Sequence, residues 1–347
     1  MSPHIAGVGT ALPPHVVDQP TVRRIVEGVF PDLSPALRRV LSTFSHEHIQ
    51  TRHFVRPPSW YAERHGFGQT NDIFIAEATE LATQAARAAL FDAELMSEAL
   101  GAVVVASTTG LATPSIDAAV ARNLGCAASV KRMPIVGLGC AGGVNGLARA
   151  AELCTVLRAP VLFVAVEICS VTMQHSDHSK SNLVGTSLFG DGAAAVVIDT
   201  VGRYPRITKS WSHLFPGTED IMGWEVVDSG LKVRFSRDIP AFISAHVAPV
   251  LHEALSSWGI AQNDIDRLIP HPGGAKVLDA YAELLGIADD ELVLARDVLR
   301  SCGNMSSATV LFVLERTLRT WRSEDRRALM TALGPGFSAE FVLLEDV

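Results

Sequence analysis

The segment VGLGCAGG, residues 136–143, leads directly into a helix-forming stretch at 144–157. Small residues surround the thiol of Cys140 at the point where strand character gives way to helix. Such a position leaves the sulfur open to a substrate and directs the positive end of the helix dipole at it, which lowers a cysteine pKa and favours the nucleophilic thiolate. A cysteine buried by packing fits the same segment equally well, because free cysteine is commonly buried. The rest of the chain has to decide between these two interpretations.

The composition predicts a compact globular protein with a large core, since 48% of the 347 residues are apolar and 19% are charged. A net charge of −8 lacks the basic character of nucleic-acid binders. Five cysteines without a CxxC pair indicate neither a disulfide framework nor a zinc site, and favour a reduced, cytoplasmic setting. No signal-peptide pattern begins the chain, and the longest apolar run, 160–173, is too short to span a bilayer.

Short β-branched runs alternate with helical patterns along the chain, which predicts an α/β fold of sheets covered by helices. The expected strands are 102–106, 161–166, 193–198, 207–211, 267–270, 328–332 and 340–344. The expected helices are 21–27, 35–44, 72–90, 115–124, 142–157, 241–258, 274–285 and 306–319. The polar, glycine-rich stretch 211–229 is expected to leave the sheet as an excursion.

The order of elements repeats weakly between the two halves of the chain. Each half has a strand, a glycine loop and a helix, and then a Gly-Cys or Cys-Gly pair before another helix, at 139–140 and at 302–303. This echo suggests a duplicated α/β unit, which we divide into residues 1–200 and 201–347.

Four further segments carry unusual local chemistry at expected strand ends or helix starts: LFGDGAAA at 188–195, HPGG at 271–274, GNMSSAT at 303–309 and GPG at 334–336. Cys140 could accept an acyl group as a thioester, while His271 and Asn304 donate hydrogen bonds to an oxygen that becomes negative. The same two donors would stabilise the enolate left when a malonyl thioester loses CO2. A cysteine hydrolase uses the same three residue types, so hydrolysis stays open at this point.

Taken together with the segment around Cys140, these motifs resemble the type III polyketide synthases, the chalcone-synthase-like family, and the resemblance covers essentially the whole chain. It implies a thiolase-type fold of two duplicated βαβαβαββ units in a five-layered αβαβα arrangement, usually a homodimer. It also implies that CoA thioesters are substrates, that no other cofactor or metal is needed, and that no acyl carrier protein is required.

The resemblance also implies roles for individual residues. Cys140 matches the acyl-carrying nucleophile, and His271 and Asn304 match the pair that supports decarboxylation. His271 would also hold Cys140 as a thiolate in an ion pair, with the helix N-terminus as support. Phe189 matches the gatekeeper between the CoA tunnel and the cavity, whereas Asp191, between two glycines, suits a structural turn.

The expected cavity wall differs from that of the plant enzymes and resembles bacterial alkylpyrone and alkylresorcinol synthases. Val233 stands where the plant pattern has a second gatekeeper phenylalanine, and Trp224 stands where it has a small residue. We expect Trp224 to limit the number of extensions, and small side chains to open a tunnel for a medium or long acyl chain. The other expected lining residues are Thr109, Cys169, Thr172 and Ser306.

The expected binding residues for the CoA phosphates are Arg38 and Arg39, in a region that also holds His46 and Arg52. Arginine binds phosphate through a planar fork of donors. The group of His175, Asp177 and His178 lacks a third metal ligand at suitable spacing, so a solvated loop is expected there.

The predicted function is therefore polyketide synthesis. An acyl-CoA loads Cys140, malonyl-CoA (or methylmalonyl-CoA) extends it two or three times, and the chain closes to a pyrone or a resorcinol-type product. The alternatives are a ketoacyl synthase III-like enzyme with a single condensation and an acyl-CoA thiol hydrolase. Enzymes like ketoacyl synthase III typically have the motif HisGlnAlaAsn at the catalytic histidine, whereas this chain has HPGG at 271–274. A non-catalytic scaffold would be expected to lack one of the three catalytic residue types.

Overall fold

The computed structural model describes residues 2–45, 48–236 and 239–346. Its largest sheet has nine strands in the order β11-β12-β13-β8-β1-β7-β6-β4-β5. These strands are β1 (His4–Ala11), β4 (Ala102–Ala106), β5 (Lys131–Ile135), β6 (Val161–Ile168), β7 (Asp191–Asp199), β8 (Arg206–Leu214), β11 (Arg267–Pro270), β12 (Arg327–Gly334) and β13 (Ser338–Glu345). Two-stranded sheets are formed by β2 (His15–Asp18) with β3 (Thr51–Phe54) and by β9 (Met222–Val227) with β10 (Gly230–Phe235).

The helices connect and cover these strands. They are α1 (Gln19–Val29), α2 (Pro35–Arg38), α3 (Phe67–Asp92), α4 (Ile116–Leu124), α5 (Gly142–Leu157), α6 (Lys180–Leu188), α7 (Ile239–Phe242), α8 (Ala248–Trp258), α9 (Ala275–Leu285), α10 (Val293–Cys302) and α11 (Thr309–Arg319). Among the described residues, no helix combines the length and the apolar character needed to cross a bilayer.

The duplication expected from the sequence is visible in the strand pairing. In the first unit β4 lies parallel to β6, β6 antiparallel to β7, and β7 antiparallel to β1. In the second unit β11 lies parallel to β12, β12 antiparallel to β13, and β13 antiparallel to β8. Apart from the inserted elements β2, α1, α2 and β3 after β1 and α6 before β7, the first unit runs β1-α3-β4-α4-β5-α5-β6-β7, a βαβαβαββ order. Within the described residues, the second unit has one strand fewer, because nothing there corresponds to β5.

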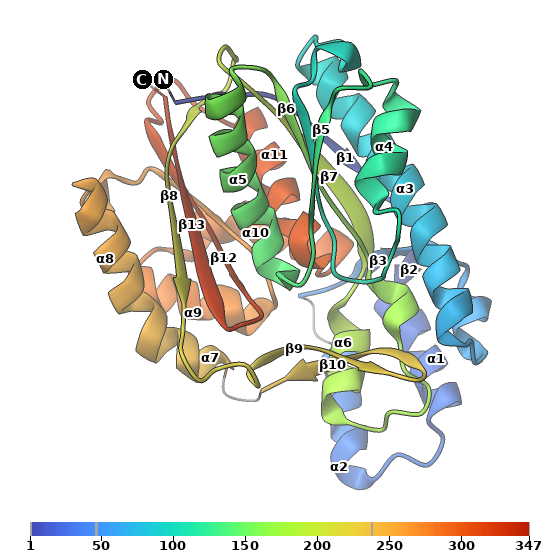
Figure 1. Cartoon of the computed structure of the whole chain (residues 1–347). Helices are drawn as coiled ribbons and strands as arrows, with labels where there is room; N and C mark the ends of the chain where they lie inside the picture. The colour runs from blue at the N-terminus through green and yellow to red at the C-terminus, as the bar shows by residue number, and fades with distance from the viewer. Residues whose placement is uncertain (1, 46–47, 237–238, 347) are drawn as a thin grey trace.

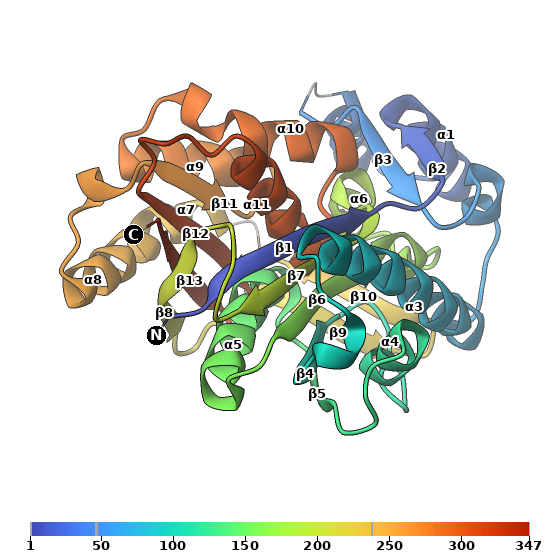
Figure 2. The same cartoon turned by 90° about the horizontal axis from the view of Figure 1, so that it is seen from above.

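Five layers result from this arrangement. Helices α5 and α11 lie in the middle, between the strands of the two units, while α3 and α4 cover one outer face and α8 and α9 the other (Figures 1 and 2). The middle helices are buried among strands of both units in one large apolar cluster. β6 is buried along its whole length, as expected of a strand covered on both faces. The central layer is therefore where the two units meet.

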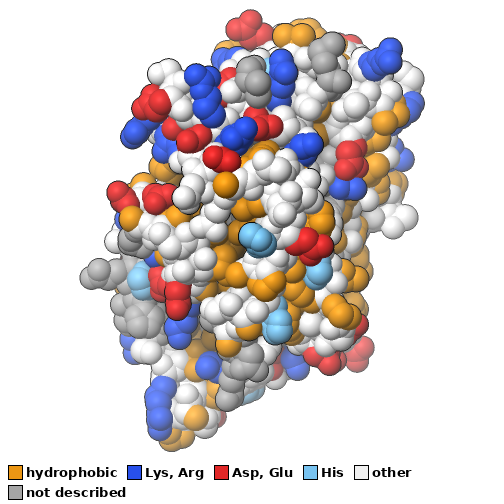
Figure 3. Space-filling view, turned by 90° about the vertical axis from the view of Figure 1, so that its left-hand side faces the viewer, with side chains coloured by type: hydrophobic (Ala, Val, Ile, Leu, Met, Phe, Trp, Pro, Cys, Tyr) orange, Lys and Arg blue, Asp and Glu red, His pale blue; other side chains and the backbone are white. Residues whose placement is uncertain are grey.

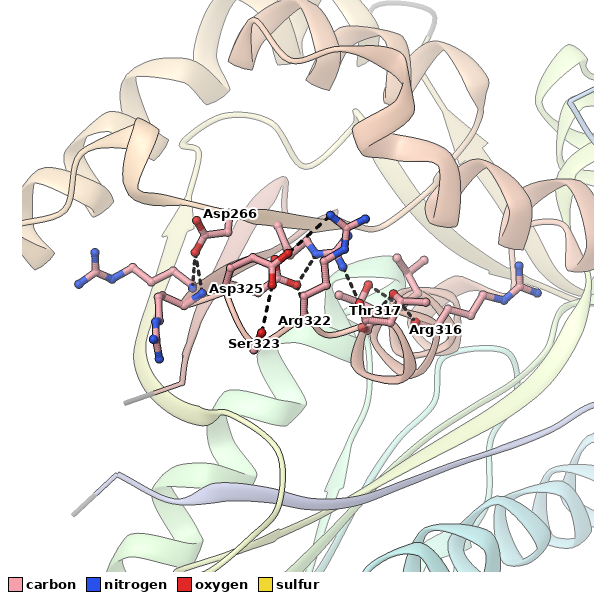
Figure 4. Close-up of polar contacts among 12 residues, drawn as sticks. Asp266, Arg316, Thr317, Arg322, Ser323 and Asp325 are labelled. Carbon is pink, nitrogen blue, oxygen red and sulfur yellow. Dashed lines mark hydrogen bonds and ion pairs between the residues drawn. The ribbon is translucent and has the colours of Figure 1, made fainter.

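The outer face over α8 is turned toward the viewer in Figure 3, where hydrophobic and histidine side chains occupy the middle and charged side chains of both signs gather above. Nearby, polar contacts fix the turn between α11 and β12 (Figure 4). Asp325 accepts a hydrogen bond from Arg267 Nε at 2.8 Å, and Asp266 accepts from the backbone N–H groups of Arg326 and Arg327, each at 2.8 Å. These contacts align the start of β12 with its parallel neighbour β11, the strand that leads to His271.

Several expected elements differ in detail. Residues 35–44 were expected to form one helix, but α2 ends at Arg38 and a 3-10 segment, Arg39–Ser45, follows. The expected excursion at 211–229 instead contains the end of β8 and the whole of β9. Some elements of the structure were not predicted from the sequence. They are the helices α6 and α10 and the strands β1, β2, β3, β5, β9 and β10. β1 is rich in small residues and β5 is an edge strand with charged residues, so neither has a long apolar run.

Candidate active site

Cys140 lies in a single 3-10 turn, Gly139–Ala141, immediately before α5. Gly139 has φ +48°, a conformation that glycine adopts without steric cost. At Gly143 a side chain would be impossible, because a Cβ atom would lie 2.2 Å from the carbonyl oxygen of Ser307. The glycines around the thiol thus serve a tight turn and a close contact between the two units.

His271 follows β11 directly, and its backbone N–H donates to the Thr331 carbonyl on β12 at 2.7 Å. The side chain is 3% exposed. Neither ring nitrogen has a hydrogen-bond partner among the described residues. A buried histidine with both nitrogens unpaired is available to a substrate, because buried polar groups otherwise nearly always find a partner.

Asn304 is held at both ends of its amide. Its Nδ2 donates to the Gly273 carbonyl at 3.1 Å, and its Oδ1 accepts from the Ser306 N–H at 2.8 Å. Its backbone N–H donates to Leu188 and its carbonyl accepts from Gly190, so that Asn304 and Phe189 form an isolated parallel β-bridge. The amide therefore has a fixed orientation, and its second Nδ2 hydrogen can be donated to the Cys140 thiol or to a bound acceptor.

Arg52 supports the β-bridge between Phe189 and Asn304 through hydrogen bonds from its side chain. Its fully buried guanidinium donates to the carbonyls of Thr186 at 2.5 Å and Phe189 at 2.8 Å, and to Gln19 Oε1 at 2.6 Å. Burial lowers the pKa of Arg52 to about 9, which the nearby charge of Asp191 opposes. Arg52 lies in the region expected to bind the CoA phosphates, but its fully buried side chain is not accessible to a phosphate.

Cys140, His271 and Asn304 line one cavity of about 500 Å³. They come from three separate parts of the chain, the start of α5, the end of β11 and the segment after α10. The cavity wall is largely apolar and includes Phe235, Leu333 and Phe337. The arrangement can bring a thiol, an imidazole and an amide together on one bound group out of bulk water.

Burial is the largest influence on the pKa values of Cys140 and His271. It raises the pKa of the Cys140 thiol to about 12; a hydrogen bond with Ser306 lowers that pKa, the charge of Glu167 raises it, and a hydrogen bond with Asn304 lowers it. Burial also lowers the pKa of His271 to about 3. Each group alone thus favours its neutral form, which differs from the expected standing ion pair. A thiolate here requires transfer of the thiol proton to the imidazole.

Sequence reasoning missed Glu167, which is the last residue but one of the apolar strand β6 and is fully buried. Its carboxylate accepts hydrogen bonds from Thr108 N–H at 2.9 Å, Thr109 Oγ1 at 2.8 Å and Ser307 Oγ at 2.6 Å. Burial raises the pKa of Glu167, which these bonds oppose. A lone acid in an otherwise apolar strand was the signal that could have identified it.

Ser306 was expected in the cavity and is instead found in contact with Cys140. Its φ of +46° lies in the left-handed region, which is unfavourable for a residue with a side chain. Hydrogen bonding to its side chain is the largest of the influences that lower the pKa of the Cys140 thiol. Strained residues of this kind concentrate at functional sites.

A smaller cavity of about 30 Å³ shares no lining residue with the first, and four of the expected lining residues border it: Cys169, Thr172, Phe189 and Val233. Phe189 packs against Phe235 with ring centroids 5.8 Å apart, and Phe235 borders the large cavity. Trp224 faces Val233 across the β9–β10 pair and lies 6.0 Å from the Phe189 ring. This aromatic layer separates the two cavities.

Three residues that were expected to bind substrate, Thr109, Arg38 and Arg39, line neither of these two cavities. Thr109 borders neither cavity, because its hydroxyl donates to Glu167 and accepts from the Ile168 N–H at 2.9 Å. The Arg38 side chain is held by the carbonyls of Leu33 and Pro31, while Arg39 is exposed on the surface. His46 lies outside the described residues.

The His175 region has contacts of its own. Nε2 of His175 lies 3.0 Å from the Tyr61 carbonyl, and Asp177 caps the Ser179 N–H at 2.9 Å. Within the part of the chain that the structure describes, no group of three or more His, Cys, Asp or Glu side chains is placed to hold a metal ion.

Comparison with known families places the chain beside one family along nearly its whole length. The model of the N-terminal domain of chalcone and stilbene synthases matches residues 3–202, and that of the C-terminal domain matches residues 206–347.

Individual relatives agree with this match. The chain is 39% identical to a 1,3,6,8-tetrahydroxynaphthalene synthase of Streptomyces peucetius, over 98% of this chain and 92% of the relative. It is 31% identical to an alpha-pyrone synthesis polyketide synthase-like protein of Mycobacterium tuberculosis, over 99% and 91%. Among solved structures, the 1,3,6,8-tetrahydroxynaphthalene synthase of Streptomyces coelicolor, a bacterial type III polyketide synthase, superposes with a TM-score of 0.94 at 30% identity, covering 99% of each chain.

Proposed function

The chain belongs to the chalcone and stilbene synthase family and is a type III polyketide synthase, a condensing acyltransferase, and from this premise we propose that Cys140 carries the growing acyl chain. The observation that carries the proposal is the convergence of Cys140, His271 and Asn304 on one cavity, with both nitrogens of His271 unpaired. The substrates are an acyl-CoA starter and malonyl-CoA, used directly without an acyl carrier protein.

Loading begins with transfer of the thiol proton of Cys140 to a ring nitrogen of His271. The sulfur attacks the thioester carbonyl of the acyl-CoA, and the C–S bond to CoA breaks while the new C–S bond to Cys140 forms. The departing CoA thiolate takes the proton back from His271. The pKa directions at this pair favour such a transfer during attack over a standing ion pair.

Extension uses the same two donors. In the apolar cavity the carboxylate of a malonyl thioester is poorly solvated, which favours loss of CO2. The electron pair left behind becomes an enolate, whose oxygen accepts hydrogen bonds from the His271 ring N–H and from the second Nδ2 hydrogen of Asn304. The enolate carbon attacks the acyl carbonyl on Cys140, and the cysteine sulfur leaves. The lengthened chain then remains on CoA and can reload.

For the product, we propose two or three extensions followed by closure to a pyrone or resorcinol. The aromatic layer of Phe189, Trp224 and Phe235 leaves only about 30 Å³ behind it, which supports few extensions. A medium or long starter would have to displace that layer. The similarity to an alpha-pyrone synthesis protein also supports this class of product.

The similarity to tetrahydroxynaphthalene synthases favours a second candidate product. A hydroxylated naphthalene contains ten ring carbons, equivalent to five two-carbon units, so it would need no long starter. Incubation with malonyl-CoA alone and with a panel of acyl-CoA starters, followed by mass spectrometry of the products, separates the two candidates.

We also propose that two copies of the chain form a dimer through β5. This strand is the edge of the nine-stranded sheet, and the next residue, Val136, is an apolar side chain that is 65% exposed. An exposed apolar side chain beside the edge of the sheet favours burial against the same surface of another copy, although the charged residues of β5 itself do not favour direct strand pairing. Sedimentation of Val136→Glu should give a monomer where the native chain gives a dimer.

Labelled acyl-CoA and intact-protein mass spectrometry test the assignment of the nucleophile. The native chain is expected to gain one acyl group, Cys140→Ala to gain none, and the neighbouring Cys169→Ala to label like the native chain. Labelling and product formation that survive in Cys140→Ala would refute the proposal. Release of free acid from acyl-CoA without malonyl-CoA would instead favour a thiol hydrolase.

A further inference from the structure

A third cavity, of about 130 Å³, is separate from the catalytic residues. Its lining has no residue in common with the large cavity that holds Cys140, His271 and Asn304. Its walls come from the segment before α3 and the first turn of that helix, from the segment after β6, and from the turn between β9 and β10. Sites for drug-sized ligands have volumes of about 300–1,000 Å³, so this cavity suits a smaller molecule.

The charged side chains that line this cavity are all basic. They are Arg64, His65 and His175, and no Asp or Glu lines it in the part of the chain that the structure describes. The chain as a whole has the opposite balance, with 37 Asp and Glu against 29 Lys and Arg. A concave surface with basic groups and no acid concentrates anions.

The two histidines are held by carbonyl groups of consecutive residues. Nε2 of His65 lies 2.9 Å from the Trp60 carbonyl, and the His65 ring stacks on the Trp60 ring with centroids 3.8 Å apart. Nε2 of His175 lies 3.0 Å from the Tyr61 carbonyl. Because a carbonyl oxygen only accepts, each Nε2 carries a hydrogen. Nδ1 of His175 has no hydrogen-bond partner among the described residues, so it can interact with a bound molecule.

Arg64 is exposed and forms neither an ion pair nor a hydrogen bond with another described residue. Burial lowers the pKa of His175, a hydrogen bond with the Tyr61 carbonyl opposes this, and the charges of Arg64 and His65 lower it further. The basic groups therefore repel one another, and a bound anion would offset that repulsion. The planar guanidinium of arginine also matches the oxygen spacing of a carboxylate or a phosphate.

We propose that the cavity lined by Arg64, His65 and His175 binds a small oxyanion, either a phosphate or a short carboxylate. Arg64 donates to the anion through its guanidinium, and the positively charged form of His175 donates through Nδ1. His65, stacked on Trp60, adds to the positive potential of the wall when it is protonated. The site is independent of the proposed function, because no residue of the catalytic cavity takes part.

Equilibrium dialysis at constant ionic strength tests the site and distinguishes the two kinds of anion. The native chain, without CoA, is dialysed against radiolabelled inorganic phosphate and, separately, against radiolabelled succinate. At least one of them is expected to bind. Arg64→Gln/His175→Gln should weaken this binding roughly tenfold or more, because two charge-assisted hydrogen bonds are lost. Failure of both anions to bind, or equal binding by the double variant, would refute the proposal.

Three controls separate lost binding from other causes. Arg64→Gln alone breaks no contact with a described residue, so it should weaken binding without lowering Tm. Arg122→Gln removes an exposed arginine on α4 that does not line the cavity, and it should bind the anion like the native chain. Saturating CoA should leave the binding unchanged in the native chain. Displacement by CoA would place the anion in the catalytic cavity and would contradict the proposal.

Trp60 provides a signal from the cavity itself. Its ring lines the cavity and stacks on His65, so binding of the anion should change the tryptophan fluorescence. Trp60→Phe keeps an aromatic ring against His65 and should still bind the anion in dialysis, but without the fluorescence change. A change of equal size in Trp60→Phe would come from other tryptophans and would show that the anion binds elsewhere.

Discussion

The backbones of Phe189 and Asn304 are paired in a parallel β-bridge, which ties the aromatic layer behind the cavity to the amide at its catalytic end. Arg52 donates to the Phe189 carbonyl at 2.8 Å from the other side. Gly303 lies so close to the Arg52 stem that a Cβ atom there would be 2.7 Å from Cγ. One buried guanidinium thus supports two parts of the site that are distant in sequence.

Replacing Arg52 tests this support. Arg52→Met keeps much of the volume and leaves three acceptors unpaired, so the free energy of unfolding should fall by about 3 kcal/mol or more. Decarboxylation of malonyl-CoA should fall as well, because Asn304 loses its fixed position. Arg52→Lys should recover part of both. Urea denaturation and CO2 release measure the two effects.

Arg56→Met is the matched control for this change. Arg56 pairs with Glu77 at 2.6 Å, but both side chains are partly exposed, so its loss should change stability by about 1 kcal/mol or less. If Arg52→Met unfolds no more readily than Arg56→Met and decarboxylates normally, Arg52 does not position the site.

Ser306 offers a way to separate backbone strain from the hydroxyl. Ser306→Gly and Ser306→Ala both remove the hydrogen bond to Cys140, which raises the pKa of that thiol and should slow its alkylation by iodoacetamide at fixed pH. Only glycine relieves the φ of +46°, so Ser306→Gly should be more stable than Ser306→Ala by about 1 kcal/mol. Equal stability of the two variants would show that the conformation is not strained, and unchanged alkylation would show that the hydroxyl does not act on the thiol.

Trp224 is expected to limit the length of chain that fits. Trp224→Ala removes a ring that packs on Phe189 and should enlarge the small cavity, so that longer acyl-CoA starters or further extensions become possible. Loss of a half-buried ring should lower stability by about 1–3 kcal/mol. Trp258→Ala, on α8, removes another half-buried tryptophan distant from the cavity and should leave the products unchanged. Identical product profiles for both variants would exclude Trp224 as a limit.

Much of the fold was predictable from the sequence because several strands of the nine-stranded sheet, such as β4 and β7, contain long apolar runs. The strands at 102–106 and 267–270 match the structure at both ends, and so does helix α5. The duplicated fold and the family followed from motifs at strand ends. Helix α6 was less predictable, since it combines polar and small residues and has no clear apolar stripe.

The site shows the same division. Recognisable sequence motifs surround Cys140, His271 and Asn304, and the structure brings the three residues to one cavity. Glu167 and Arg52 carry no such signal, because their importance comes from burial and from partners far along the chain. Nor could the protonation of the Cys140–His271 pair be predicted, since the helix dipole favours a thiolate whereas burial, visible only in the fold, opposes it.

The pH dependence of stability tests this burial of His271. Its pKa of about 3 in the folded chain lies below its ordinary value near 6.5, so between these pH values the unfolded chain binds a proton that the folded chain does not. Stability is therefore lost as the pH falls through this window. Between pH 7.5 and pH 5 the native chain should lose about 2 kcal/mol more than His271→Gln, which has no proton to bind. Urea denaturation at both pH values measures the difference between the two chains, in which contributions from the other histidines cancel. An equal loss in the two chains would mean that His271 takes up its proton as readily when folded as when unfolded, and the neutral pair at Cys140 would then be excluded.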